Sequence, residues 1–177
     1  MLLAPTPLDQ KLVEGEQVRF RPEEGSTKLP QTGGCQCRQI CYEIAQEPQL
    51  VYTCHCLDCQ RLTSSAFSLG AVVPEMEFRL TGVEPRQLQR SGDSGRVNTR
   101  VVCAESGSWV CGMPRDGVIH VKGGTLDDMS WLRPTKHIWV RRKQPWVKFP
   151  RAMNSSKDSL RDRAVSFLAS LRSPTQR

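Results

Sequence analysis

The chain has 177 residues, of which 38% are hydrophobic and 24% charged, a balance typical of one globular domain with its own core. No apolar run approaches the roughly 18 residues of a membrane span, so the sequence predicts no transmembrane helix. The first seven residues lack the basic and apolar regions of a secretory signal. We therefore expect a cytoplasmic or nuclear protein that is not secreted.

The net charge of +7 is unevenly distributed along the chain. Residues 133–177 contain 12 Lys/Arg and 2 Asp/Glu, a net of +10, whereas the rest contains 13 and 16, a net of −3. Such a basic segment can bind nucleic acid, an acidic partner or an anionic substrate. A solvated basic tail is the plainer interpretation.

Short alternating segments separated by turns predict a mainly β domain. Residues 1–30 are polar and rich in proline, which indicates an extended arm, and residues 32–34 indicate a turn. One or two helical turns are expected at 57–62, and residues 76–80 are expected to pair with 87–90. Strands are predicted at 38–44, 50–54, 67–73, 76–80, 87–90, 97–103, 109–111, 118–122 and 137–140. Because no long helix separates them, an antiparallel architecture is favoured over βαβ units.

The end of the chain has a different pattern. Apolar residues recur at helical spacing between Leu160 and Leu171, which predicts a helix over about residues 157–171. This helix is expected to pack on the domain or on a second copy of the chain. The predicted organisation is an arm over 1–30, a metal-binding domain over 31–150, and a basic helix and tail over 151–177.

Five of the eight cysteines fall into two tight groups, Cys35-x-Cys37 and Cys54-x-Cys56-x-x-Cys59. Thiolates bind zinc at about 2.3 Å, and a turn of one or two residues can bring such side chains around one ion. The spacing therefore predicts a zinc site in a reducing compartment. Disulfides, iron–sulfur ligation and plain buried cysteines are the alternatives.

The remaining cysteines allow up to two zinc ions per chain. One site would use Cys35, Cys37 and Cys103 with a further group, and the other would use the cluster at 54–59. A closed site with four ligands is structural, whereas three protein ligands leave a position for water or substrate. The three-cysteine cluster is thus the candidate catalytic site, acting on a thiol nucleophile or as a Lewis acid on another small molecule.

Specific segments of the chain follow a known family pattern. They are Gly33-Gly34-Cys35-Gln36-Cys37, Cys54-His55-Cys56-Leu57-Asp58-Cys59, Cys103 with Gly107-Ser108, Gly124-Thr125-Leu126-Asp127-Asp128, His137-Ile138-Trp139 and Lys143-Gln144-Pro145-Trp146. Over roughly residues 32 to 150, the chain resembles the glutathione-dependent formaldehyde-activating enzyme and centromere protein V family.

The resemblance implies a β-tent fold with two zinc sites. It implies a structural zinc on Cys35, Cys37 and Cys103, and a second zinc, near a glutathione site, on Cys54, Cys56 and Cys59. It further implies a carbon–sulfur lyase-type enzyme that adds glutathione to formaldehyde, with a thiol or aldehyde as small-molecule partner. The centromere protein V branch is chromatin-associated, so a non-catalytic zinc module that binds DNA, chromatin or protein through the basic C-terminal part is the alternative.

One position departs from the family pattern. The family usually has Cys-x-x-Cys at the third segment, where this chain has Cys103-Ala104-Glu105-Ser106. Cys111, Cys41 or Glu105 are candidates to replace the missing ligand, or the site is weakened or empty.

Residues outside the cysteine groups give weaker indications. His55 alternates with two predicted ligands along a strand, so it should point away from their metal. Candidate substrate-binding residues are Arg61, Ser64, Phe67 and His137, and a second copy of the chain is a further possible partner.

Overall fold

The computed structural model describes residues 28–92, 95, 97–113, 116–149 and 154–155. The predicted arm up to residue 27 and the predicted helix over 157–171 lie outside these ranges, and the domain boundaries stay a prediction. None of the helices in the described ranges has the length and apolar character that crossing a membrane requires.

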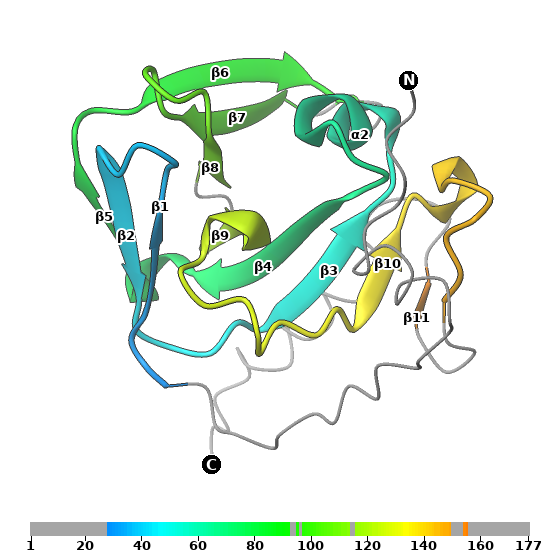
Figure 1. The fold of residues 1–177 in the computed structure, drawn as a ribbon, viewed down its shortest axis with the longest axis horizontal. Helices are drawn as coiled ribbons and strands as arrows, with labels where there is room; N and C mark the ends of the chain where they lie inside the picture. The colour runs from blue at the N-terminus through cyan, green and yellow to red at the C-terminus, as the bar shows by residue number, and fades with distance from the viewer. Residues whose placement is uncertain (1–27, 93–94, 96, 114–115, 150–153, 156–177) are drawn as a thin grey trace, which may run out of the picture.

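The described part is mainly β, as the sequence predicts (Figure 1). Its strands are β1 Gln31–Gly34, β2 Ile40–Ile44, β3 Leu50–Cys54, β4 Ser68–Pro74, β5 Phe78–Gly82, β6 Arg86–Ser91, β7 Val97–Val102, β8 Trp109–Gly112, β9 Val118–Lys122, β10 Lys136–Ile138 and β11 Asn154–Ser155. The α-helix is α2, Leu57–Thr63, and 3₁₀ turns span Glu75–Glu77, Gly123–Thr125 and Val140–Arg142.

The strands form a small sheet, β1-β2-β5, and a large sheet, β11-β10-β3-β4-β9-β8-β7-β6. Pairing is antiparallel except at one edge of the large sheet, where β10 runs parallel to β3 and to β11. The segment after β9 carries the chain back across the sheet, so that β10 enters beside β3 in the same direction. The antiparallel prediction thus needs this correction at one edge.

The predicted pairing of residues 76–80 with 87–90 is wrong. β5 pairs with β2 in the small sheet, from Phe78 opposite Ile44 to Gly82 opposite Ile40. β6 pairs instead with β7 in the large sheet. Gly82, with φ of 97°, makes the turn after which the chain leaves one sheet for the other.

The predicted turn at residues 32–34 is also wrong, because these residues belong to β1 and pair with β2. Glycine is needed at position 33 because neighbouring atoms leave no room for a side chain, not because the backbone turns there. A Cβ on Gly33 would lie 2.3 Å from the Tyr42 ring and 2.4 Å from the Thr125 carbonyl oxygen.

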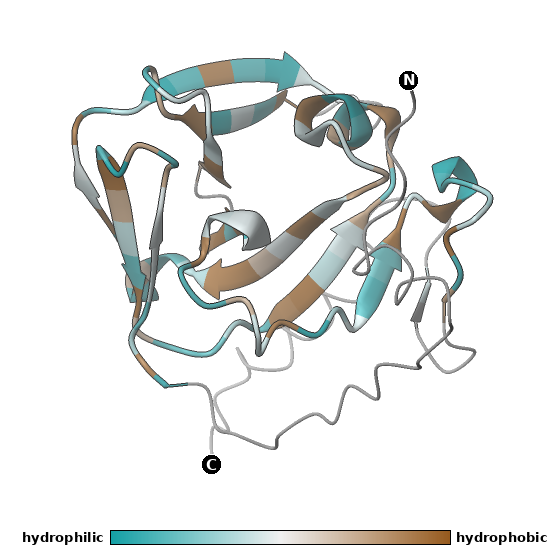
Figure 2. Cartoon of the chain, in the orientation of Figure 1, coloured by the Kyte–Doolittle hydropathy of each residue, from teal (hydrophilic) through white to brown (hydrophobic). Residues whose placement is uncertain are grey.

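Two apolar clusters lie on opposite faces of the large sheet, as the alternation of side chains along a strand requires. On one face Val51, Ala71 and Val121 pack with Ile40 and Ile44 of the small sheet, forming the main core. On the other face a smaller cluster contains Tyr52, Cys54, Val72, Ile138 and Trp139. Figure 2 shows apolar residues at intervals along β2, β3 and β4.

Candidate metal centres

The 54–59 cysteines meet where β3 ends and α2 begins. Cys54 is the last residue of β3, Cys56 is the N-cap of α2, and Cys59 lies in the first turn of that helix. The Cys56 sulfur accepts a hydrogen bond of 3.3 Å from the Cys59 backbone N–H, which fixes the turn. The three sulfurs lie within 4.8 Å of one another, and we call this group the helix triad.

His55 is not part of the helix triad, as strand alternation predicts. It is fully buried, and its Nε2 lies 3.0 Å from the Thr53 hydroxyl, which also contacts His137.

Side chains from two neighbouring strands complete the surroundings of the helix triad. Ser68 on β4 is opposite Cys54, and Lys122 on β9 is in register with Gly70, next to Tyr52, so these side chains share the face of Cys54. Lys122 is only 8% exposed, and its Nζ lies 3.6 Å from the centre of the Trp109 ring. Burial lowers the pKa of Lys122, and its charge acts on the thiols of Cys59 and Cys54.

The helix triad fits a thiophilic metal ion with three protein ligands. The thiols of Cys54 and Cys56, followed by Lys122 and Ser68, hold the pKa of Cys59 below its ordinary value. The Ser68 hydroxyl is buried and has no well-formed hydrogen bond within the described residues, so it is available to a ligand sulfur. No additional Cys, His, Asp or Glu of the described residues joins the group, which leaves one tetrahedral position to an outside ligand.

Cys35, Cys37 and Cys103 form a second group, which we call the sheet triad. Cys35 and Cys37 lie between β1 and β2, and Cys103 directly follows β7. The Cys37 sulfur lies 3.5 Å from both the Cys35 and the Cys103 sulfur. A tetrahedral zinc with bonds of about 2.3 Å separates its sulfurs by about 3.8 Å, so this spacing also fits a metal.

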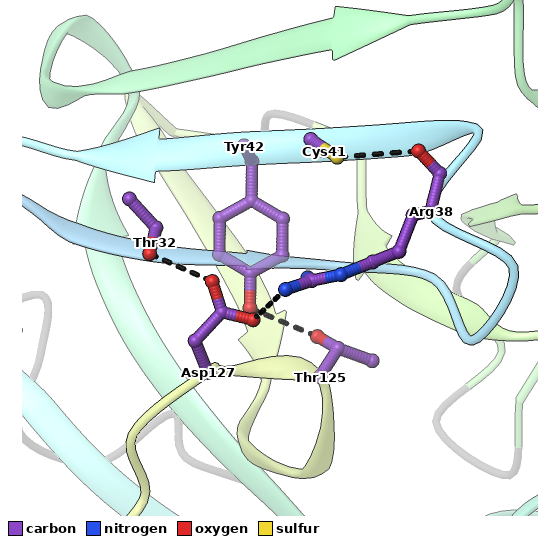
Figure 3. A network of polar contacts seen from close by, with 6 residues as sticks. All are labelled: Thr32, Arg38, Cys41, Tyr42, Thr125 and Asp127. Atoms are coloured by element: carbon purple, nitrogen blue, oxygen red, sulfur yellow. Dashed lines mark hydrogen bonds and ion pairs between the residues drawn. The ribbon is translucent and has the colours of Figure 1, made fainter.

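The structure does not bring Cys111, Cys41 or Glu105 into the sheet triad. Cys111 lies within β8, opposite Val121, and burial raises its pKa to about 12. The Cys41 thiol donates to the Arg38 carbonyl oxygen at 3.3 Å, as Figure 3 shows. Glu105 is exposed.

A polar network holds the loop beside the sheet triad. Asp127 accepts from Arg38 at 2.6 Å and from the Thr32 hydroxyl at 2.7 Å (Figure 3). The Tyr42 and Thr125 hydroxyls are 2.9 Å apart in the same network. These contacts fix the turn after β9 against the small sheet.

The four candidate substrate-binding residues separate into two pairs. Arg61 and Ser64 line a groove of about 450 Å³ between α2 and the segment of Gln144 and Trp146. His137 stacks on Phe149, with ring centres 3.9 Å apart, and is in register with Thr53 rather than Cys54. Phe67 packs on His55. The structure therefore places Phe67 and His137 beside His55, and neither of them lines the groove.

Lys122 and Ser68 are site residues that the sequence interpretation missed. Ser68 lies near the start and Lys122 at the end of a segment that the sequence predicts only as a strand. The register across β3, β4 and β9 brings them to the face of Cys54. The one indication in the sequence was that the largely apolar segment 118–122 ends in a lysine.

Comparison with known proteins identifies the class of this chain. Residues 30–142 match the sequence pattern of the glutathione-dependent formaldehyde-activating enzyme family. The chain belongs to that family.

A Rhodobacter sphaeroides protein of known crystal structure is similar to 54% of this chain and 87% of its own, with 16% sequence identity and a TM-score of 0.43. No curated protein matches the chain.

Proposed function

We propose that the protein is a zinc-dependent carbon–sulfur lyase-type enzyme that joins a thiol to a small aldehyde. The observation that supports it is the helix triad, whose three sulfurs lie within 4.8 Å without a further ligand residue in the described chain. The family to which the chain belongs suggests glutathione and formaldehyde as the two substrates.

Zinc bound at the helix triad would supply a soft Lewis acid that keeps an incoming thiol in its thiolate form near neutral pH. The net reaction would form one carbon–sulfur bond, between the thiol sulfur and the aldehyde carbonyl carbon, and the thiol proton would end on the carbonyl oxygen. Nothing is oxidised or reduced, so no further cofactor is required.

Lys122 has the position of a charge-compensating residue in this reaction. A divalent ion with three thiolates carries one net negative charge, and an incoming thiolate adds another. The buried ammonium of Lys122 is electrostatically coupled to Cys59 and Cys54, so it would stabilise the extra charge.

The groove beyond α2 offers a place for the rest of the thiol substrate. Arg61 lines it and can pair with a carboxylate such as those of glutathione. Ser64 and Gln144 add hydrogen-bonding groups, and the largely exposed Trp146 adds an apolar wall.

The first test is zinc content, measured by elemental mass spectrometry on the wild type and on a Cys54→Ser/Cys56→Ser variant. We expect two zinc ions in the wild type, one in the variant, and loss of aldehyde-dependent thiol consumption above the uncatalysed rate. Cys41→Ser, which removes a thiol outside both triads, is the matched control. Equal zinc content and equal turnover in wild type and variant would contradict the proposal. The Lewis-acid alternative would be favoured if the variant loses zinc while the wild type consumes no thiol and instead turns over another electrophile.

A further inference from the structure

The sheet triad has a serine where a fourth ligand would complete a closed site. The Ser106 backbone N–H donates to the Cys103 sulfur at 3.5 Å, so residue 106 folds back onto the triad. Ser106 is three positions after Cys103, the place at which the family pattern has its second cysteine.

A second serine holds Ser106 in this position. The hydroxyls of Ser106 and Ser108 are 3.0 Å apart, and the Ser108 oxygen accepts a hydrogen bond of 3.0 Å from the Gln36 backbone N–H. Either of the two hydroxyls can donate to the other, and accepting from Gln36 leaves the Ser108 proton free for this bond. The place of a fourth thiolate is thus lined by hydroxyl groups, which bind zinc far more weakly than thiolates.

Solvent reaches residues beside this place, since Cys37 is exposed and Ser106 is partly exposed. Cys35 and Cys103 are each 1% exposed, but Cys37 is exposed. A metal held by the three sulfurs would therefore have buried ligands on one side and an accessible one on the other. Within the described chain no Cys, His, Asp or Glu completes the set.

We propose that the sheet triad is a second three-thiolate metal centre, whose fourth position beside Ser106 holds an exchangeable ligand that a small thiol can displace. The centre would thus bind a soft outside ligand. A fourth cysteine at position 106 would instead fill the coordination sphere and leave no position for such a ligand. This inference concerns a different triad from the proposed activity and does not depend on it.

The test uses cobalt(II) in place of zinc in a Cys54→Ser/Cys56→Ser background, with a phosphine as reductant. Adding 2-mercaptoethanol should shift the visible absorption as sulfur replaces oxygen at the metal. Adding Ser106→Cys to this background should give the shifted spectrum from the start, with no response to the thiol. Ser106→Ala should keep the response. The proposal would be overturned if the spectrum did not respond to the thiol and was the same with and without Ser106→Cys. It would also be overturned if cobalt bound only to the Ser106→Cys variant.

Metal release from the otherwise unaltered chain gives a second readout if the background variant does not fold. We expect zinc to transfer to a chelating dye in two phases, one for each triad. Ser106→Cys should slow one phase by about tenfold or more, because changes in residues around metal ligands already alter metal affinity by that factor. Unchanged release from both sites would count against an open fourth position.

Discussion

Lys122 shows how one residue can cost stability and serve binding. Its side chain is only 8% exposed, and its ammonium faces the Trp109 ring rather than a carboxylate of the described residues. Burying a charge with so little compensation is unfavourable for folding. We infer that its benefit appears when the helix triad carries negative charge.

Replacing this lysine should therefore separate stability from binding. Lys122→Met should raise the thermal stability of the metal-free protein and weaken thiol binding to the metal-loaded protein by roughly tenfold, or about 1.4 kcal/mol. Calorimetric titration with glutathione and a thermal melt measure the two effects. The exposed Lys148→Met is the control, and a variant that binds the thiol as tightly as the wild type would refute the role.

At the scale of single elements, β1 depends on a close approach that only glycine allows. Gly33→Ala should lower the free energy of unfolding by about 2 kcal/mol or more, because the new methyl group meets the Tyr42 ring and the Thr125 carbonyl. Gly124→Ala is the matched control, since nothing lies within 4 Å of its added Cβ. Urea denaturation compares the two, and equal losses would contradict the packing argument.

The elements themselves were largely predictable from local pattern, and their partners were not. Alternation placed β2 correctly, because every second residue of that strand is buried, and short runs between turns placed β3 and β9. The pairing of β5 with β2 depends on which sheet each strand joins, a non-local choice made by packing against the core. Likewise Cys54, Cys56 and Cys59 were found by spacing, whereas Lys122 required the register of three strands.

At the scale of the whole molecule, the two triads differ in what they connect. The sheet triad joins the small sheet to the end of β7, and Cys35 and Cys103 belong to the main core. The helix triad joins β3 only to α2, in the smaller cluster. Metal at the sheet triad should therefore contribute more to stability, since a ligand that binds only the folded state stabilises it.

This difference predicts unequal losses on metal removal. Cys37→Ser changes an exposed side chain, so its effect should come from the lost metal rather than from packing. We expect it to lower Tm by several degrees and to abolish most of the effect of a chelator on Tm. Cys56→Ser should keep a chelator-sensitive Tm. Thermal melts with and without chelator test this, and the reverse order would contradict it.

The sequence separation within each triad has a consequence for how the chain acquires metal. The helix triad spans 6 residues, so a growing chain can close it around an ion before any sheet exists. In the sheet triad, Cys37 and Cys103 are 66 positions apart, and binding there closes a long loop at a correspondingly larger entropic cost to the unfolded chain. We therefore expect the helix triad to bind its ion during synthesis. The sheet triad should bind its ion only after the two sheets have formed.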